Sequence, residues 1–178
     1  MHDGADPCRS PGNAATNWRR IGPQSGSSVR EHVHEEQPFW ERIKLRDLSP
    51  EQWESLCDGC GKCCLEKFEE EETGRIVYSQ VACTLLDLDT CRCRDYPNRA
   101  ARVSDCVTLT PAALARPQWL PETCAYRRLA EGRPLPRWHP LITGDPSSVV
   151  EAGHSVRGRV LAPHPDMDPM MHLIDWIR

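Results

Sequence analysis

Closely spaced cysteines are the residues of this chain best suited to chemistry. The segment Cys57-Asp-Gly-Cys60-Gly-Lys-Cys63-Cys64 contains two overlapping C-x-x-C pairs, followed at once by a fourth cysteine. Two intervening residues allow a tight turn to direct both sulfurs at one ion. Gly59 and Gly61 permit the positive φ angles that such turns need, and they leave backbone N–H groups free to point at thiolates. This segment, the cysteine knuckle, therefore predicts metal binding.

The chain holds more thiols than one metal ion requires. Nine of its ten cysteines lie between Cys57 and Cys124, whereas a structural zinc site takes about four ligands. Adjacent side chains such as Cys63 and Cys64 diverge in both helices and strands, so they do not easily converge on one ion. Either two metal sites share the knuckle, or one site is accompanied by a buried thiol. The candidate ligands are Cys57, Cys60, Cys63, Cys64, Cys83, Cys91, Cys93, Cys106 and Cys124.

The sequence leaves the metal open between zinc and an iron–sulfur cluster. The spacing Cys57-x2-Cys60-x2-Cys63 matches the first three ligands of a bacterial ferredoxin run. The fourth position departs from that run, because Cys64 follows immediately where a ferredoxin has three residues and then Cys-Pro. Thiolates bind both metals, so the ligand type does not decide between them.

The N-terminal sequence bears on whether the thiols are reduced. It shows no basic region followed by an apolar stretch of the kind that marks a secretory signal. We therefore expect a cytoplasmic protein, in which metal thiolates are favoured over disulfides. No apolar run approaches the ~18 residues of a membrane span, so no membrane partner is expected.

The composition predicts a small domain with a marginal core. Leu, Ile, Val and Phe make up about 19% of the residues, near the level at which packed cores fail. Residues 1–37 are rich in Gly, Pro, Ser and Asn and are expected to form a disordered leader in which Cys8 is a free thiol. Residues 38–178 are expected to form one irregular, cysteine-rich α+β domain of short helices and a short sheet, stabilised by metal.

Local patterns predict the elements of this domain. Ser49-Pro50-Glu51-Gln52 is a strong helix start, with helix expected over 50–57. Further short helices are expected over 110–116, 121–130 and 168–177, and strands over 75–81 and 155–161. The charge run 66–72 is interpreted as a solvated helical face, and the proline-rich residues 133–147 as a loop.

Few other residues suggest chemistry. His139 is interpreted as a packing or hydrogen-bonding residue, with a ligand or general base as the alternative. Asp58 is expected to cap a turn, and Arg99 either to support a thiolate or to form a surface ion pair. No serine nucleophile elbow, phosphate-binding glycine loop or H-E-x-x-H pattern is present. The mild net charge of −4, and arginines without interleaved aromatics, argue against nucleic-acid binding.

The motifs resemble a known bacterial family. CDGCGKCC, a cysteine before Leu85–Leu86, the run from Cys93 to Arg99 that includes Tyr96, and Cys106 resemble the zinc- or iron-chelating CxxCxxCC proteins. TCAYRRLAEG, LPRWHPLITG and SVRGR are similar to the YcgN-like branch, to which Cys91 and Cys124 look specific. The likeness covers roughly residues 38–177. It implies shared cysteines at positions 57, 60, 63, 64, 83, 93 and 106. More distant members have been called Fe–S oxidoreductases or linked to lysine methylation of flagellin.

The sequence thus predicts a cytoplasmic protein that binds zinc or an iron–sulfur cluster through clustered thiolates. The alternative is a redox or methyl-transfer-related enzyme in which an iron–sulfur cluster does the chemistry. No catalytic residue and no protein partner can be named from the sequence.

Overall fold

The computed structural model describes residues 37–178, which fall within one compact unit, Glu36–Arg178. The expected leader and its Cys8 lie outside the described residues, apart from residue 37. None of the helices within 37–178 is long and apolar enough to cross a membrane.

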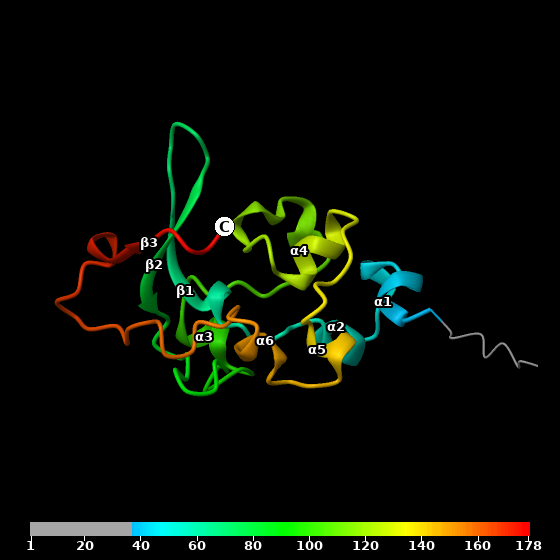
Figure 1. The fold of residues 1–178 in the computed structure, drawn as a ribbon. Helices are drawn as coiled ribbons and strands as arrows, with labels where there is room; N and C mark the ends of the chain where they lie inside the picture. The colour runs from blue at the N-terminus through cyan, green and yellow to red at the C-terminus, as the bar shows by residue number, and fades with distance from the viewer. Residues whose placement is uncertain (1–36) are drawn as a thin grey trace, which may run out of the picture. The chain divides into compact units, whose positions relative to one another are not determined.

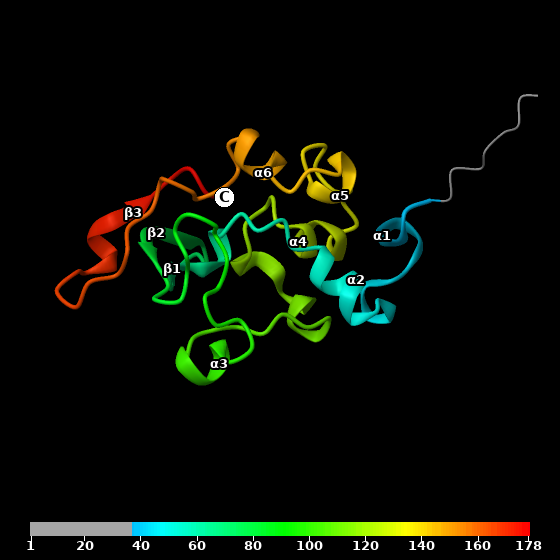
Figure 2. The same cartoon turned by 90° about the horizontal axis from the view of Figure 1, so that it is seen from below.

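The described unit combines short helices with a small sheet, as expected of an irregular α+β domain (Figures 1 and 2). Its α-helices are α1 (Phe39–Arg42), α2 (Pro50–Ser55), α3 (Arg99–Arg102), α4 (Ala125–Ala130), α5 (Pro140–Thr143) and α6 (Ser148–Glu151). Its 3₁₀ turns are η1 (Leu45–Asp47), η2 (Lys62–Cys64), η3 (Ala112–Ala115), η4 (Pro117–Trp119) and η5 (Pro169–His172). The strands β1 (Leu65–Glu69), β2 (Ile76–Ala82) and β3 (Leu173–Ile174) form one antiparallel sheet in the order β1-β2-β3.

Helix α2 forms where its start signal predicts, and it leads directly into the knuckle. The Ser49 side chain accepts the Gln52 N–H, and the Gln52 side chain accepts the Ser49 N–H, which completes a capping box around Pro50. The helix ends at Ser55, two residues earlier than expected, and the following Leu56 is fully buried. This burial fixes the position from which the chain enters the cysteine segment.

The charge run 66–72 is not helical, so that interpretation was wrong. Its first half lies in β1, which pairs with β2 through Phe68↔Val77 and Glu69↔Ile76. Its second half forms the hairpin loop, closed by the bond from the Glu70 N–H to the Arg75 carbonyl. Pairing with β2, the strand expected over 75–81, overrides the local helical preference of the glutamates.

Three further expectations need correction. Residues 155–161 form no strand; only Leu161 makes an isolated bridge, to Val81. Residues 168–177 form η5 and then β3 instead of a helix, because Leu173 and Ile174 pair with β2. The expected loop 133–147 contains α5, which begins at Pro140 in the first helical position, where proline is well tolerated. The two expected helices at 110–116 and 121–130 appear in shortened form, as η3 and α4.

Two separate apolar clusters hold the unit together. The first packs on the sheet and comprises Leu65, Tyr78, Ala82, Leu86, Cys91, Val156 and Ile177. The second lies among the helices and comprises Leu56, Leu114, Leu120, Ala125, Tyr126 and Leu135. The knuckle lies between Leu56 of the second cluster and Leu65 of the first. Figures 1 and 2 show the same separation, with the sheet on one side of this unit and helices α2, α4 and α5 on the other.

Gly61 is a position where only glycine fits. Its φ is +78°, and an added Cβ would lie 2.7 Å from the Val156 Cγ2 and 3.3 Å from the Cys91 Cβ. We expect Gly61→Ala to lower the free energy of unfolding by about 2–4 kcal/mol, from left-handed backbone strain plus overpacking. Gly144→Ala is the control, because its φ is +73° and no atom lies within 4 Å of the added Cβ. Urea unfolding of both variants isolates the clash; equal losses would contradict it.

Candidate metal centre

The cysteine knuckle has the backbone geometry that metal-binding turns require. Gly59 and Gly61 both adopt positive φ, at 71° and 78°. The Cys57 thiol accepts the N–H of Gly59, and the Cys60 thiol accepts that of Lys62. The expected cap at Asp58 is confirmed, since its Oδ1 accepts the Cys60 N–H at 3.0 Å. Each sulfur is therefore oriented by the backbone two residues further along the chain.

Two cysteines outside the knuckle are held in the same way. The Leu85 N–H donates to the Cys83 Sγ at 3.5 Å. The Cys124 thiol accepts N–H groups from Tyr126 and Arg127 at the start of α4. Backbone donors offset the negative charge that these sulfurs carry as thiolates.

Seven of the nine described cysteines line one cavity of about 290 Å³. Its walls also include Trp53, Trp119 and Tyr126 from the helical side, and Leu65, Leu85 and Leu86 from the sheet side. All nine are free thiols. The cavity-lining cysteines are Cys57, Cys63, Cys64, Cys83, Cys91, Cys93 and Cys106.

The adjacent cysteines Cys63 and Cys64 belong to different surroundings. Cys63 packs with Cys124 against the helical cluster, whereas Cys64 packs with Cys83 against the sheet cluster. The two side chains nevertheless interact. The largest cause that raises the pKa of Cys63 is a hydrogen bond with the Cys64 side chain. The pair thus joins two groups of thiols.

The electrostatics show which thiols are neighbours. The charge of Cys63 acts on the thiols of Cys57, Cys60 and Cys124. Cys106 responds to Cys83 and Cys93 and, more weakly, to Cys63. These effects associate Cys57, Cys60, Cys63 and Cys124, here called the helical-side group, and they associate Cys106 mainly with Cys83 and Cys93. We add Cys64 to this second, sheet-side group because it packs with Cys83 against the sheet cluster.

Burial favours the protonated form of the Cys60 and Cys124 thiols in the metal-free chain. It raises the pKa of the Cys124 thiol to about 12 and is the main cause that raises the pKa of Cys60. Asp58 and Cys63 raise the pKa of Cys60 further by charge repulsion. A bound cation reverses this balance, because thiols must lose their protons to become ligands.

Three basic side chains also line the cavity. The Lys67 Nζ donates to the carbonyls of Cys63 and Leu65, each at 3.1 Å. The Arg92 guanidinium lies against Gly59, where an added Cβ would come within 2.8 Å of it. Arg99 stacks over the Tyr96 ring at 3.6 Å, and the Tyr96 hydroxyl donates to Glu54. Among the described residues Arg99 forms no ion pair, but its positive charge acts to lower the pKa of the Cys106 thiol, which agrees with the expected support of a thiolate.

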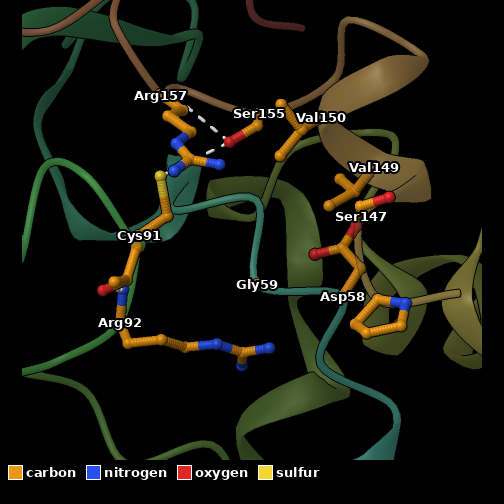
Figure 3. Close-up of a pocket in the computed structure, with 11 residues that line it drawn as sticks. Asp58, Gly59, Cys91, Arg92, Ser147, Val149, Val150, Ser155 and Arg157 are labelled. Carbon is orange, nitrogen blue, oxygen red and sulfur yellow. Dashed lines mark hydrogen bonds between the residues drawn. The ribbon is translucent and has the colours of Figure 1, made fainter.

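A second cavity, of about 310 Å³, borders the knuckle at Asp58 and Gly59 (Figure 3). Gly59, Cys91 and Arg92 line both cavities. Cys91 is buried, has a positive φ of 55°, and its Sγ lies 3.4 Å from the Ser155 Oγ. Figure 3 shows this contact and the Arg92 side chain extending beneath Gly59.

His139 has the packing role that its sequence context favours. It is fully buried; its Nδ1 accepts the Leu141 N–H and its Nε2 therefore donates to the Leu56 carbonyl, both at 3.1 Å. It fixes Leu56, directly before the knuckle, from the start of α5.

The neutral form of His139 predicts a loss of stability in acid. Burial lowers the pKa of His139 below its ordinary value of about 6.5, so the unfolded chain takes up this proton first as the pH falls. The stability that neutral His139 contributes is fully present above pH ~6.5 and is lost as the pH falls below that value. We expect His139→Gln to be less stable by about 1–3 kcal/mol at pH 7.5 but to vary less between pH 7.5 and 5.5. Urea unfolding at both pH values checks this; an unchanged pH dependence would contradict it.

The donor set fits a thiophilic metal, although the thiols do not form a closed coordination shell. Within residues 37–178, no three Cys, His, Asp or Glu side chains are grouped so that they could hold one ion. The Asp58 Oδ2 is buried beside the knuckle thiols and has no hydrogen-bond partner, which is an arrangement that a nearby cation relieves. Soft sulfur donors oriented by N–H groups suit zinc or iron. Binding therefore requires the thiols to turn further toward the cavity.

Sequence reasoning identified Arg99 but missed the other two basic residues that line the cavity, Lys67 and Arg92. Lys67 was part of a charge run, and Arg92 was one of many arginines. The available signal was position: Lys62 and Lys67 are the only lysines within ten residues of the knuckle centre, in a segment otherwise rich in acids.

Comparison with known proteins agrees with this site. Residues 56–125 match the CxxCxxCC family described as "Putative zinc- or iron-chelating domain". A UPF0260 protein of Gluconacetobacter diazotrophicus is 54% identical over 139 residues, covering 78% of this chain and 87% of the relative. A second, from Mesorhizobium japonicum, is 57% identical over 142 residues, covering 80% and 96%. A third, from Rhodopseudomonas palustris strain TIE-1, is 62% identical over 122 residues, covering 68% and 72%. No solved structure matches. With this identity over most of its length, the chain belongs to the UPF0260 family of CxxCxxCC proteins.

Proposed function

We propose that this chain is a cytoplasmic metal-binding protein whose clustered cysteines hold more than one atom of zinc or iron. The observation that carries the proposal is the convergence of seven free thiols on one cavity. These thiols come from segments as far apart as Cys57 and Cys106, and a purely apolar core has no need of them. The match to a chelating domain supports the same function.

The size of the cavity favours more than one metal atom. A single zinc ion binds four ligands at about 2.0–2.3 Å and leaves no open space between them. The cavity volume of about 290 Å³ is much larger than the ~30 Å³ that one water molecule occupies in the liquid. Two zinc ions, or the iron and sulfide atoms of a cluster, would use this space and the surplus of thiols.

The two thiol groups give the proposed ligands. Cys57, Cys60, Cys63 and Cys124 would hold metal on the helical side, and Cys64, Cys83, Cys93 and Cys106 on the sheet side. Cys91 completes the set of nine, from the boundary between the two cavities. Bound zinc would join the two apolar clusters, whereas an iron–sulfur cluster would in addition allow electron transfer.

Metal analysis of anaerobically purified protein tests this proposal. We expect zinc and iron together to exceed one atom per chain, with absorption near 400 nm and acid-labile sulfide if iron predominates. A colourless protein with about two zinc ions would assign a zinc centre. Less than about 0.2 metal atoms per chain, after reconstitution with either zinc or iron and sulfide, would overturn the proposal.

A further inference from the structure

Lys62 is the one lysine or arginine that is buried among residues 37–178. Its side chain is only 4% exposed, and its Nζ donates to the Thr123 Oγ1 at 3.0 Å. No carboxylate of the described residues lies within ion-pairing distance of it (4.0 Å). A buried ammonium with a single neutral partner is unfavourable unless a negative charge nearby compensates it.

The position of Lys62 in the chain puts it next to side chains that become negative when they bind metal. Lys62 lies in η2 between Cys60 and Cys63, and its backbone N–H donates to the Cys60 thiol. Its partner Thr123 directly precedes Cys124. The ammonium therefore links the knuckle to the segment that carries the fourth thiol of the helical-side group.

Asp58 is the other buried charge of the knuckle, and it has the opposite sign. It is 6% exposed, and its Oδ2 has no hydrogen-bond partner. Burial lowers the pKa of His154. The positive charge of Lys62 lowers this pKa further and the negative charge of Asp58 raises it, so both charges lie near the His154 ring. Asp58 raises the pKa of the knuckle thiols by charge repulsion. The Lys62 ammonium lies in the same buried region, as its effect on His154 and its hydrogen bond to Thr123 indicate.

The charge balance of a loaded site follows directly. Four thiolates around one divalent cation carry a net charge of about −2, which the low dielectric of a buried site penalises. We propose that Lys62 is the buried counter-charge of the metal–thiolate centre and that Asp58 opposes metal binding. Both residues act on the metal through the thiolates and positioned dipoles; neither is assigned as a ligand. This inference rests on the proposed function.

Two substitutions of similar size shift the local charge in opposite directions. Lys62→Met removes the positive charge and keeps an unbranched side chain, whereas Asp58→Asn removes the negative charge and keeps the oxygen that caps Cys60. Lys62→Met should weaken zinc binding by about 10- to 100-fold, as is usual for the loss of an outer-sphere partner. Asp58→Asn should tighten it. A purely structural role for the two residues predicts weaker binding in both variants.

The full-length chain is titrated anaerobically with zinc(II) in competition with a chromophoric chelator. Lys44→Met, which removes an exposed lysine, is the charge-matched control and should change the affinity less than about twofold. Thr123→Val removes the hydrogen bond of Lys62 and keeps its charge, so it should lose less affinity than Lys62→Met. Where Lys62→Met does not fold, Asp58→Asn still decides.

The outcomes separate the two proposals. Opposite shifts for Lys62→Met and Asp58→Asn support the counter-charge. Weaker binding by Asp58→Asn, or wild-type affinity in Lys62→Met, overturns the inference while metal binding itself stands. Absence of zinc and iron binding by the wild-type chain overturns the proposed function instead.

Discussion

Removal of the metal under reducing conditions is expected to abolish the cooperative thermal unfolding transition. Each apolar cluster is small. The knuckle connects the two clusters along the chain, and the thiol-lined cavity has walls from both. Structural zinc contributes about 10–16 kcal/mol of apparent binding free energy in small domains, comparable to the whole stability of ~5–15 kcal/mol that is typical of a protein. Without metal, the thiols that line the cavity provide no coordination that joins the two clusters.

Calorimetry on the holo-protein, and on protein treated with a strong chelator and a reductant, measures this effect. Restoration of the transition by added metal is the control that distinguishes metal loss from irreversible damage. If a sample shown by elemental analysis to be metal-free unfolds at the wild-type temperature, the metal is not required for folding.

Substitution at the adjacent cysteines is expected to divide the bound metal. Cys63 packs on the helical cluster with Cys124, and Cys64 packs on the sheet cluster with Cys83. If each serves its own group, Cys63→Ala and Cys64→Ala should each remove about half of the metal, since a structural site rarely survives with three ligands. The double variant should retain none.

Metal per chain in the three variants, measured beside Cys8→Ser, decides this point. Cys8→Ser should keep the wild-type content, because Cys8 is isolated in the polar leader. Unchanged metal in Cys64→Ala together with lower stability would indicate a buried thiol instead of a ligand. Loss of all metal from either single variant would mean that the two sulfurs serve one shared centre.

The sequence by itself determined which residue types the site contains and where the helix that leads into it begins. The spacing of Cys57, Cys60 and Cys63, with glycines between them, required tight turns of positive φ, and the structure has them. The capping box at Ser49 likewise determined α2, because its hydrogen bonds join residues only three positions apart. Such short-range features depend on few neighbours and can be read from local sequence.

Only the tertiary structure decided how the thiols are grouped and which charges lie beside them. Pairing with β2 placed the first half of the charge run 66–72 in β1 and residues 173–174 in β3, which local preference does not specify. The same packing divided Cys63 from Cys64 and buried Lys62 against Thr123, 61 residues away. Burial and long-range contact set these features, so the spacing of cysteines along the chain does not reveal them.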